Sequence, residues 1–76
     1  MKDILLTLLT AIVDNADALS VDETDEEGVV TLTIHVAPED MGKVIGKDGK
    51  VIRAIRNVMK IPAMKQQKKV QIALAE

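Results

Sequence analysis

Apolar residues at the start of the chain recur with the period of a helix. Over residues 3–16 they return every three or four positions, which predicts an amphipathic helix with Asp3 as its N-cap. The apolar positions of this face are Ile4, Leu5, Leu8, Leu9, Ile12 and Ala16. Leu6 and Val13 make the face broader than one contact requires. We expect it to be buried under a neighbouring element, with self-association as the alternative.

The next segments alternate between apolar and polar positions, with the period of a strand. Residues 18–26 predict a short strand, and residues 29–36 (VVTLTIHV) predict a clearer one. The sequence DEEG at 25–28 predicts the turn that joins them as a hairpin. One face of the sheet should therefore be apolar, and the other polar and exposed to water. The expected polar positions are Ser20, Asp22, Thr24, Thr31, Thr33, His35 and Gln71.

Two helices and a last strand are predicted in the second half of the chain. Pro38 ends the second strand and opens a short helix that stops at Gly46. A longer helix is predicted over residues 50–60, followed by a loop over 61–67 (IPAMKQQ) and a strand over 69–75 (KVQIALA). The residues expected on the buried side of the longer helix are Val51, Ile52, Ile55, Val58 and Met59.

The predicted order of elements is α-β-β-α-α-β, in a single domain over residues 1–76. The helical crossover between the second and third strands requires these strands to be parallel, with a right-handed connection. The hairpin adds the first strand antiparallel to the second. The predicted fold class is therefore α+β, with a three-stranded mixed sheet covered on one face by three helices.

Composition excludes several classes of function. The chain has no Phe, Tyr or Trp, so its core must be aliphatic, and it cannot stack bases on exposed rings as RRM domains do. It has no Cys, which excludes disulfides and thiolate metal sites. His35 is the only histidine and has no second ligand at a metal-binding spacing, and Ser20 has no base to activate it. We expect no cofactor, no metal and no enzymatic activity.

Charge is distributed unevenly along the chain, although the net charge is only −2. Residues 1–40 contain one lysine and ten acidic residues, whereas residues 41–76 contain nine basic and two acidic residues. Such asymmetry indicates either a polyanionic partner for the basic half or attraction between the two halves within the fold.

The apolar stretch from Ile4 to Val13, followed by Ala16-x-Ala18, superficially resembles a secretory signal. However, Asp3 offsets the charge of Lys2, and ten residues are too few to span a bilayer. We expect the chain to be cytoplasmic.

The segment VIGKDGKVIRAIR (44–56) places Gly46 and Gly49 three positions apart in a basic region. A loop here, between two helices, would let a phosphate backbone approach closely and meet the free N–H groups of a helix start. The surrounding cations are Lys43, Lys47, Lys50, Arg53 and Arg56. A P-loop is excluded, because Gly42 and Gly46 have one residue too few between them and Asp48 occupies the position of the required hydroxyl.

The motif VIGKDGKVI resembles the (V/I)-I-G-x-x-G-x-x-I signature of KH domains, and the order of elements resembles their type II arrangement. The resemblance covers essentially the whole chain and is greatest to the small stand-alone bacterial KhpA family. It implies binding of single-stranded RNA in the cytoplasm and RNA-chaperone activity. It also implies a homodimer, pairing with a larger KH protein similar to KhpB, and effects on cell shape and envelope synthesis.

Carried onto this sequence, the resemblance implies that residues 46–49 clamp the backbone of about four nucleotides. Val44 is expected to line an apolar groove for the bases, while Ile45 and Ile52 hold the helices together. The last strand and the preceding loop would form the other wall, where Lys65, Lys68 and Lys69 add charge. The expected RNA-binding residues are Lys43, Val44, Gly46, Lys47, Asp48, Gly49, Lys50, Arg53 and Arg56.

Asp48 places a negative charge inside the expected clamp. It either opposes phosphate or caps the following helix, and we prefer the cap. The broad apolar helix face and Asp48 also favour an alternative function, in which the domain is an interaction or dimerisation module and scaffolds an RNA-binding partner. Since no residue evidently reads a 2′-hydroxyl, single-stranded DNA stays a second candidate ligand.

Overall fold

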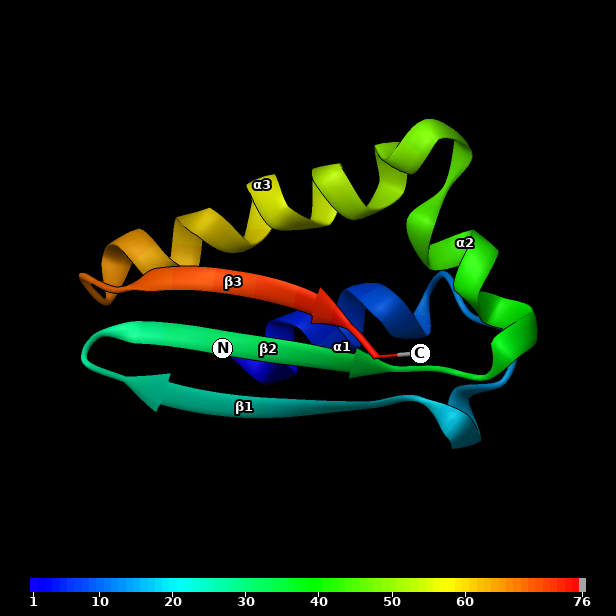
Figure 1. Ribbon diagram of the computed structural model, residues 1–76, viewed down its shortest axis with the longest axis horizontal. Helices are drawn as coiled ribbons and strands as arrows, with labels where there is room; N and C mark the ends of the chain where they lie inside the picture. Colours follow the sequence, from blue (N-terminus) through cyan, green and yellow to red (C-terminus); the bar gives the residue numbers. More distant parts are fainter. Residues whose placement is uncertain (76) are drawn as a thin grey trace.

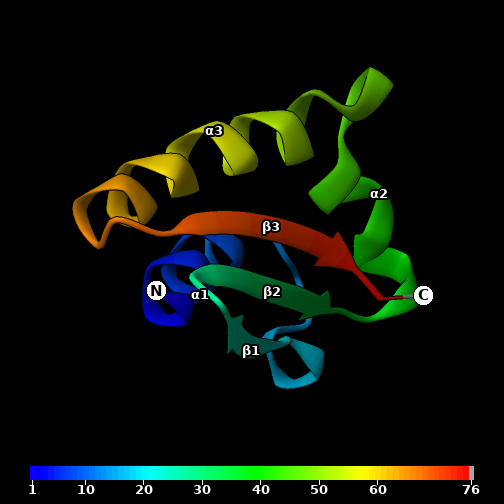
Figure 2. The same ribbon diagram turned by 60° about the vertical axis from the view of Figure 1, so that its left-hand side comes forward.

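The structure of the protein is a computed structural model that describes residues 1–75. Figures 1 and 2 show three α-helices, three strands and short 3₁₀ turns in the predicted order. The elements are α1 (Lys2–Thr10), η1 (Ala16–Ala18), β1 (Ser20–Glu26), β2 (Val29–His35), η2 (Pro38–Asp40), α2 (Met41–Ile45), η3 (Lys47–Gly49), α3 (Lys50–Lys65) and β3 (Lys69–Leu74).

The three strands form one mixed sheet in the order β1-β2-β3. β1 is antiparallel to β2, and the turn between them is only two residues long, Glu27 and Gly28, both with positive φ (52° and 80°). Two such residues are typical of the type I′ turn, which matches the twist of a hairpin. β3 is parallel to β2, with Ile72 opposite Leu32. The predicted α+β fold with a mixed sheet is confirmed, and it is the type II KH arrangement.

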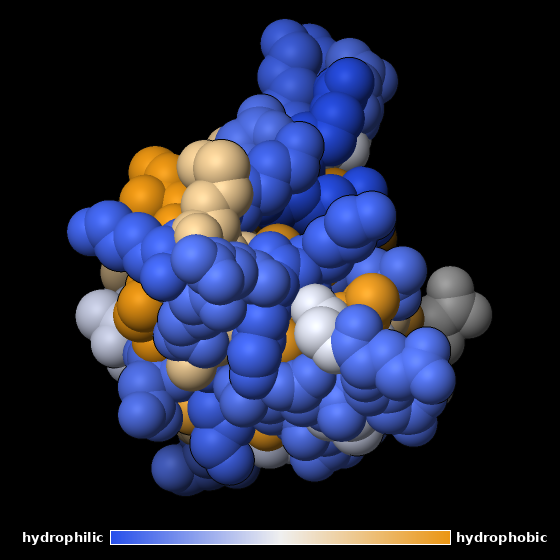
Figure 3. Space-filling view, turned by 90° about the vertical axis from the view of Figure 1, so that its left-hand side faces the viewer, coloured by the Kyte–Doolittle hydropathy of each residue, from blue (hydrophilic) through white to orange (hydrophobic). Residues whose placement is uncertain are grey.

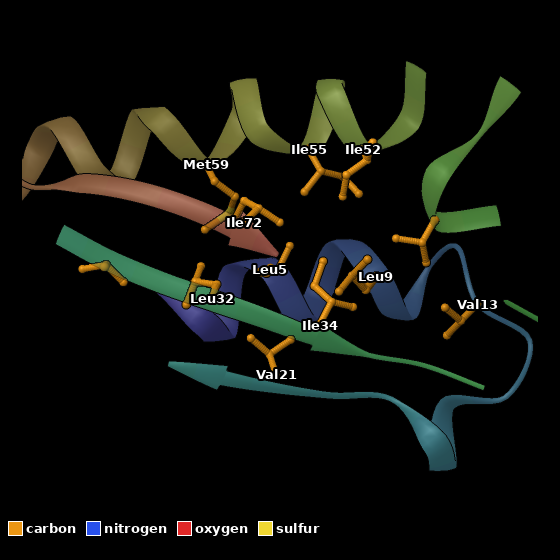
Figure 4. Close-up of a cluster of buried hydrophobic side chains, with 12 residues drawn as sticks. Leu5, Leu9, Val13, Val21, Leu32, Ile34, Ile52, Ile55, Met59 and Ile72 are labelled. Atoms are coloured by element: carbon orange, nitrogen blue, oxygen red, sulfur yellow. The ribbon is translucent and has the colours of Figure 1, made fainter. Parts of the chain in front are cut away.

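The core is aliphatic and lies between the sheet and the helices (Figure 4). Leu5 and Leu9 of α1, Leu32 and Ile34 of β2 and Met59 of α3 are all 0% exposed. No helix in the described part of the chain is both long and apolar enough to span a membrane.

Helix α1 ends six residues earlier than predicted, at Thr10. Its N-cap is Met1, so the predicted cap Asp3 is wrong and this residue lies in the first turn. The chain leaves the helix because the N–H groups of Asp14 and Asn15 donate to the carboxylate of Asp40, at 3.1 and 2.9 Å. That partner is 25 residues or more away in the sequence, so the local pattern could not predict it.

Helix α3 is longer than predicted and ends at Lys65, because residues 61–65 of the segment predicted as a loop are helical. Pro62 removes one backbone hydrogen bond from the helix. Burial of Ala63 (2% exposed) favours continuation of the helix into this segment. The helix then closes with the N–H of Lys68 bonded to the carbonyl of Ala63 (2.9 Å) and Gln67 in the left-handed region (φ 57°), which is a Schellman-type end.

Candidate nucleic-acid interface

The loop between α2 and α3 has an unusual backbone at three of its four residues. Gly46 adopts φ 76° and ψ 175°, Asp48 φ 57° and ψ 26°, and Gly49 φ 73° and ψ 18°. The N–H of Gly46 bonds to the carbonyl of Gly42 (2.8 Å) and ends α2, while the N–H of Gly49 bonds to the carbonyl of Gly46 (3.2 Å). The loop is therefore a tight elbow that turns the chain sharply between the two helices (Figure 1).

The two glycines of the loop differ in the space around them. A Cβ on Gly46 would lie 2.3 Å from Cγ2 and 2.9 Å from the backbone N of Val51, so this glycine is required by the packing of the loop against α3. A Cβ on Gly49 would meet only Cγ2 of Ile52, at 4.0 Å. The expected room for an approaching phosphate backbone is therefore available beside Gly49, whereas Gly46 is fixed by the fold itself.

Asp48 does not cap α3, so the preferred interpretation of this residue is wrong. The N-cap is Gly49, and no side-chain hydrogen bond caps the helix. Asp48 instead occupies the left-handed region, which Asp and Asn tolerate better than most residues. Its exposed carboxylate remains in the loop, beside Lys47.

Arg53 holds the loop in place, a role that the sequence analysis missed. Its guanidinium donates to the carbonyls of Asp48 (2.8 Å) and Gly49 (3.3 Å). The sequence feature that could have predicted this role is the position of Arg53 one turn after Gly49, from which an exposed arginine can reach back to the start of its own helix. Because two contacts leave further guanidinium N–H donors for a ligand, Arg53 both supports the elbow and places a charge beside it.

The cations of the basic half fall into two groups. Lys43 pairs with Asp14, which raises the pKa of Lys43, and Lys68 pairs with Asp25. By contrast, no carboxylate among residues 1–75 forms an ion pair with the four remaining cations of the loop and early α3: Lys47, Lys50, Arg53 and Arg56. The ion pairs support attraction between the two halves in part, while a polyanionic partner for the basic half stays a prediction. The two halves attract each other at Lys43 and Lys68, and exposed cations are left around the elbow.

Val44 and Ile45 have the reverse of their expected roles. Val44 is 0% exposed and belongs to the core, so it cannot line a groove for bases. Ile45 is 40% exposed, whereas Ile52 is buried as expected. Helix α2 has only five residues, and one turn and a half is too short for periodicity to show which of two adjacent aliphatic residues faces the core.

A basic groove of about 470 Å³ runs between α3 and β3. Its lining residues are Arg53, Arg56, Asn57 and Lys60 from α3 and Val70, Gln71 and Ile72 from β3. The last strand therefore forms the second wall, as the sequence analysis expected, but Lys65, Lys68 and Lys69, which were expected to add charge there, do not line this groove. This groove begins at the elbow, because Arg53 contacts the loop and also lines the groove.

β3 contributes an open backbone edge to the basic groove. The N–H groups of Lys69 and Ala75 bond to the carbonyls of Gly28 and Ile34, both at 2.9 Å. In a parallel pair, alternate residues bond to the neighbouring strand. Among the residues between Lys69 and Ala75, the alternate ones, such as Val70 and Ile72, therefore direct their N–H and C=O groups away from β2, towards the free edge.

An apolar groove of about 440 Å³ lies on the other flank of α3, against α1. Except for Lys50, its lining is apolar: Leu8, Ile12, Val51, Ala54, Ile55 and Val58. Val58, which was expected to be buried, is 43% exposed there. Figure 3 shows hydrophobic residues gathered at the upper left of a face that is otherwise largely hydrophilic.

Asp40 is the buried polar side chain that connects this site to the rest of the fold. It is 0% exposed, and the hydrogen bonds that its carboxylate accepts from the N–H groups of Asn15 and Asp14 lower the pKa of this group. Because Asp40 directly precedes α2, this contact ties the start of that helix to the end of α1. The sequence analysis did not predict the burial of Asp40.

Other potential sites are less developed. His35 and Asp22 contact each other at 2.8 Å on the open face of the sheet. Among residues 1–75, no cluster of three or more His, Asp or Glu side chains is arranged to hold a metal ion.

Comparisons with known proteins found similar sequences over nearly the whole chain. The family model described as "KhpA/KhpB, KH domain" matches residues 2–74. A protein of Clostridium acetobutylicum named "RNA-binding protein KhpA" is 45% identical over 97% of this chain and 99% of its own length. Its namesakes in Caldanaerobacter subterraneus subsp. tengcongensis and Aquifex aeolicus are 42% identical (97% of this chain, 99% of theirs) and 36% identical (100% and 96%). No solved structure matches significantly. The chain therefore belongs to the KhpA/KhpB family of KH domains.

Proposed function

We propose that this protein binds single-stranded RNA, with the elbow at residues 46–49 on the phosphates and the α3–β3 groove on the bases. One observation carries the proposal. Lys47, Lys50, Arg53 and Arg56 surround the elbow without an ion pair among residues 1–75, while Lys43 and Lys68 are paired with acids. The names of the relatives support RNA as the ligand.

The elbow and the α3–β3 groove have different roles in this proposal. Exposed cations attract the phosphates, and the tight turn beside Gly49 leaves space for the backbone of the strand. The open edge of β3 at Val70 and Ile72 offers donors and acceptors to the edges of unpaired bases. With about three phosphates neutralised, the logarithm of the binding constant should fall with the logarithm of salt concentration with a slope of about −2.

Two lysines of the same segment provide a matched test. Lys47→Ala and Lys43→Ala each remove one positive charge, but only Lys47 is outside an ion pair in the described part of the chain. Binding of a short fluorescent RNA would be measured by anisotropy at several salt concentrations. Lys47→Ala should weaken binding and make the salt slope shallower by about 0.7, the effect of one phosphate contact on a single strand. Lys43→Ala should change both quantities less.

Equal losses in the two variants would mean that RNA responds to net charge alone, and the assignment of the elbow would be wrong. Unchanged binding in Lys47→Ala would also contradict it. Circular dichroism of both variants shows whether a loss reflects unfolding. The same titration with DNA of matching sequence decides whether the 2′-hydroxyl contributes.

The apolar groove favours a second function, formation of a homodimer. Along α3, apolar residues recur at heptad-like spacing on its exposed side: Val51, Ala54, Val58 and Ile61, the last 53% exposed. Such a stripe is self-complementary, so two copies related by a two-fold axis can bury it against each other. Because the basic groove is on the opposite flank of α3, a dimer of this kind would leave both RNA sites open.

Sedimentation equilibrium tests this association. The wild type should be a dimer, and Val58→Glu should be a folded monomer that still binds short RNA. A monomeric wild type contradicts the homodimer, and dimerisation only with a larger KH protein would assign the groove to that partner. The RNA-chaperone role, the cytoplasmic location and the effects on cell shape and envelope synthesis stay predictions from the family resemblance.

A further inference from the structure

We infer that the RNA-binding surface continues into a second, apolar base-binding subsite at the C-terminal end of α3. This distal subsite has a volume of about 300 Å³ and is lined by Lys60, Ala63, Met64, Lys68, Lys69 and Val70. The inference rests on the proposed function, because it concerns nucleotides of the same strand that extend beyond those held at the elbow.

The distal subsite is continuous with the basic groove. Lys60 and Val70 line both of them, so a strand can pass from one to the other without leaving the surface. Met64 is 14 residues after Lys50 on α3, about 21 Å along the helix axis at 1.5 Å per residue. A KH loop clamps about four nucleotides, so those that follow them along α3 are the natural occupants of the distal subsite.

The chemistry of the distal subsite fits a nucleobase. Met64 is 68% exposed, the highest value among the large apolar side chains exposed in residues 1–75, and it lies beside buried Ala63. A thioether is polarizable and makes favourable contacts with aromatic rings. The chain has no aromatic residue to stack on, so an exposed methionine is the platform that it offers at this end.

The charges around the distal subsite direct the strand along α3. Lys60 and Lys69 are exposed, and no acid in the described part of the chain forms an ion pair with either. Lys68 is engaged by Asp25 of β1, and Glu26 and Glu27 follow on the exposed hairpin. This acidic side repels phosphate, whereas the α3 side attracts it.

The test measures how affinity grows with RNA length. Random-sequence, fluorescently labelled RNAs of about four and eight nucleotides would be titrated by anisotropy, with affinities corrected for the number of binding registers. Wild type should bind the longer RNA about tenfold more tightly per register, the scale of one base contact. Met64→Glu should keep the affinity for the shorter RNA and lose the gain. Thr7→Glu, which makes the same charge change on an exposed position of α1, should behave as wild type.

A second readout follows the subsite directly. In the wild type, the Met64 methyl resonance should shift with the longer RNA and stay in place with the shorter one. Equal affinity per register for both RNAs, or a full gain in Met64→Glu, overturns the distal subsite while the elbow stands. If wild type binds neither RNA, the proposed function fails and the distal subsite fails with it.

Discussion

The two loop glycines should respond very differently to alanine, although they occupy equivalent places in the motif. In Gly46→Ala, the new Cβ would meet Val51 at 2.3 Å (Cγ2), at a backbone conformation of φ 76° and ψ 175°. In Gly49→Ala, the nearest atom would be 4.0 Å away, and the backbone is left-handed helical, with φ 73° and ψ 18°.

The magnitudes follow from these geometries. The backbone region of Gly46 costs a residue with a Cβ about 1–3 kcal/mol. Moving Val51 or the start of α3 out of the overlap adds about 1–3 kcal/mol, as other overpacked sites do. Gly49→Ala should cost only about 1–2 kcal/mol, the cost of the left-handed backbone conformation for a residue with a Cβ. A domain of this length has a free energy of unfolding of about 4–11 kcal/mol, so Gly46→Ala removes a large share of it.

Urea unfolding followed by circular dichroism measures both variants. In a thermal scan of the same variants, each kcal/mol of lost stability should lower the melting temperature by about 4–8 °C in a domain of this size. Val51→Ala added to Gly46→Ala should recover only a small part of the loss, because it removes Cγ2 of Val51 but leaves Cβ and the backbone N of this residue at 2.8 and 2.9 Å from the new Cβ. Equal destabilisation of the two single variants would refute the assignment of Gly46 to internal packing.

The remaining predictions concern side chains whose environment the structure revealed. The pKa of Asp40 is lowered below its ordinary 3.8, so its contribution to stability is full above pH 3.8 and is lost as the pH falls through the lower folded-state value. Urea unfolding at several pH values should show this loss in the wild type, and Asp40→Asn should lack that component. Val44→Ala should cost about 2 kcal/mol and Ile45→Ala less than about 1 kcal/mol, and the opposite order would contradict the observed burial.

Periodicity was sufficient to predict the sheet, because β2 and β3 are long enough to show their alternation. Leu32, Ile34 and Ile72 are buried as their positions required. It failed at the end of α1, where the amides of Asp14 and Asn15 bond to Asp40, and this partner is distant in sequence. It also failed at Pro62, since a proline predicts the end of a helix unless tertiary packing favours continuation.

The sequence predicted which residues make up the candidate site, but not how they contact one another. The cations of the motif are where the pattern placed them, yet charge alone could not show that Lys43 is held by Asp14 while Lys47 is outside any ion pair in residues 1–75. Similarly, the support that Arg53 gives to the carbonyl of Asp48 depends on a left-handed turn that the sequence does not specify uniquely. Pairing between distant residues decides which charges a ligand can use.

A ¹⁵N-edited NMR titration with a short, unstructured RNA tests the central claim most directly. If the elbow grips the phosphates and the α3–β3 groove receives the bases, shifts should concentrate at residues 46–57 and 70–72. The open sheet face around His35 should remain unperturbed. Shifts centred on that face, or none at the elbow at RNA concentrations that saturate binding, would contradict the account.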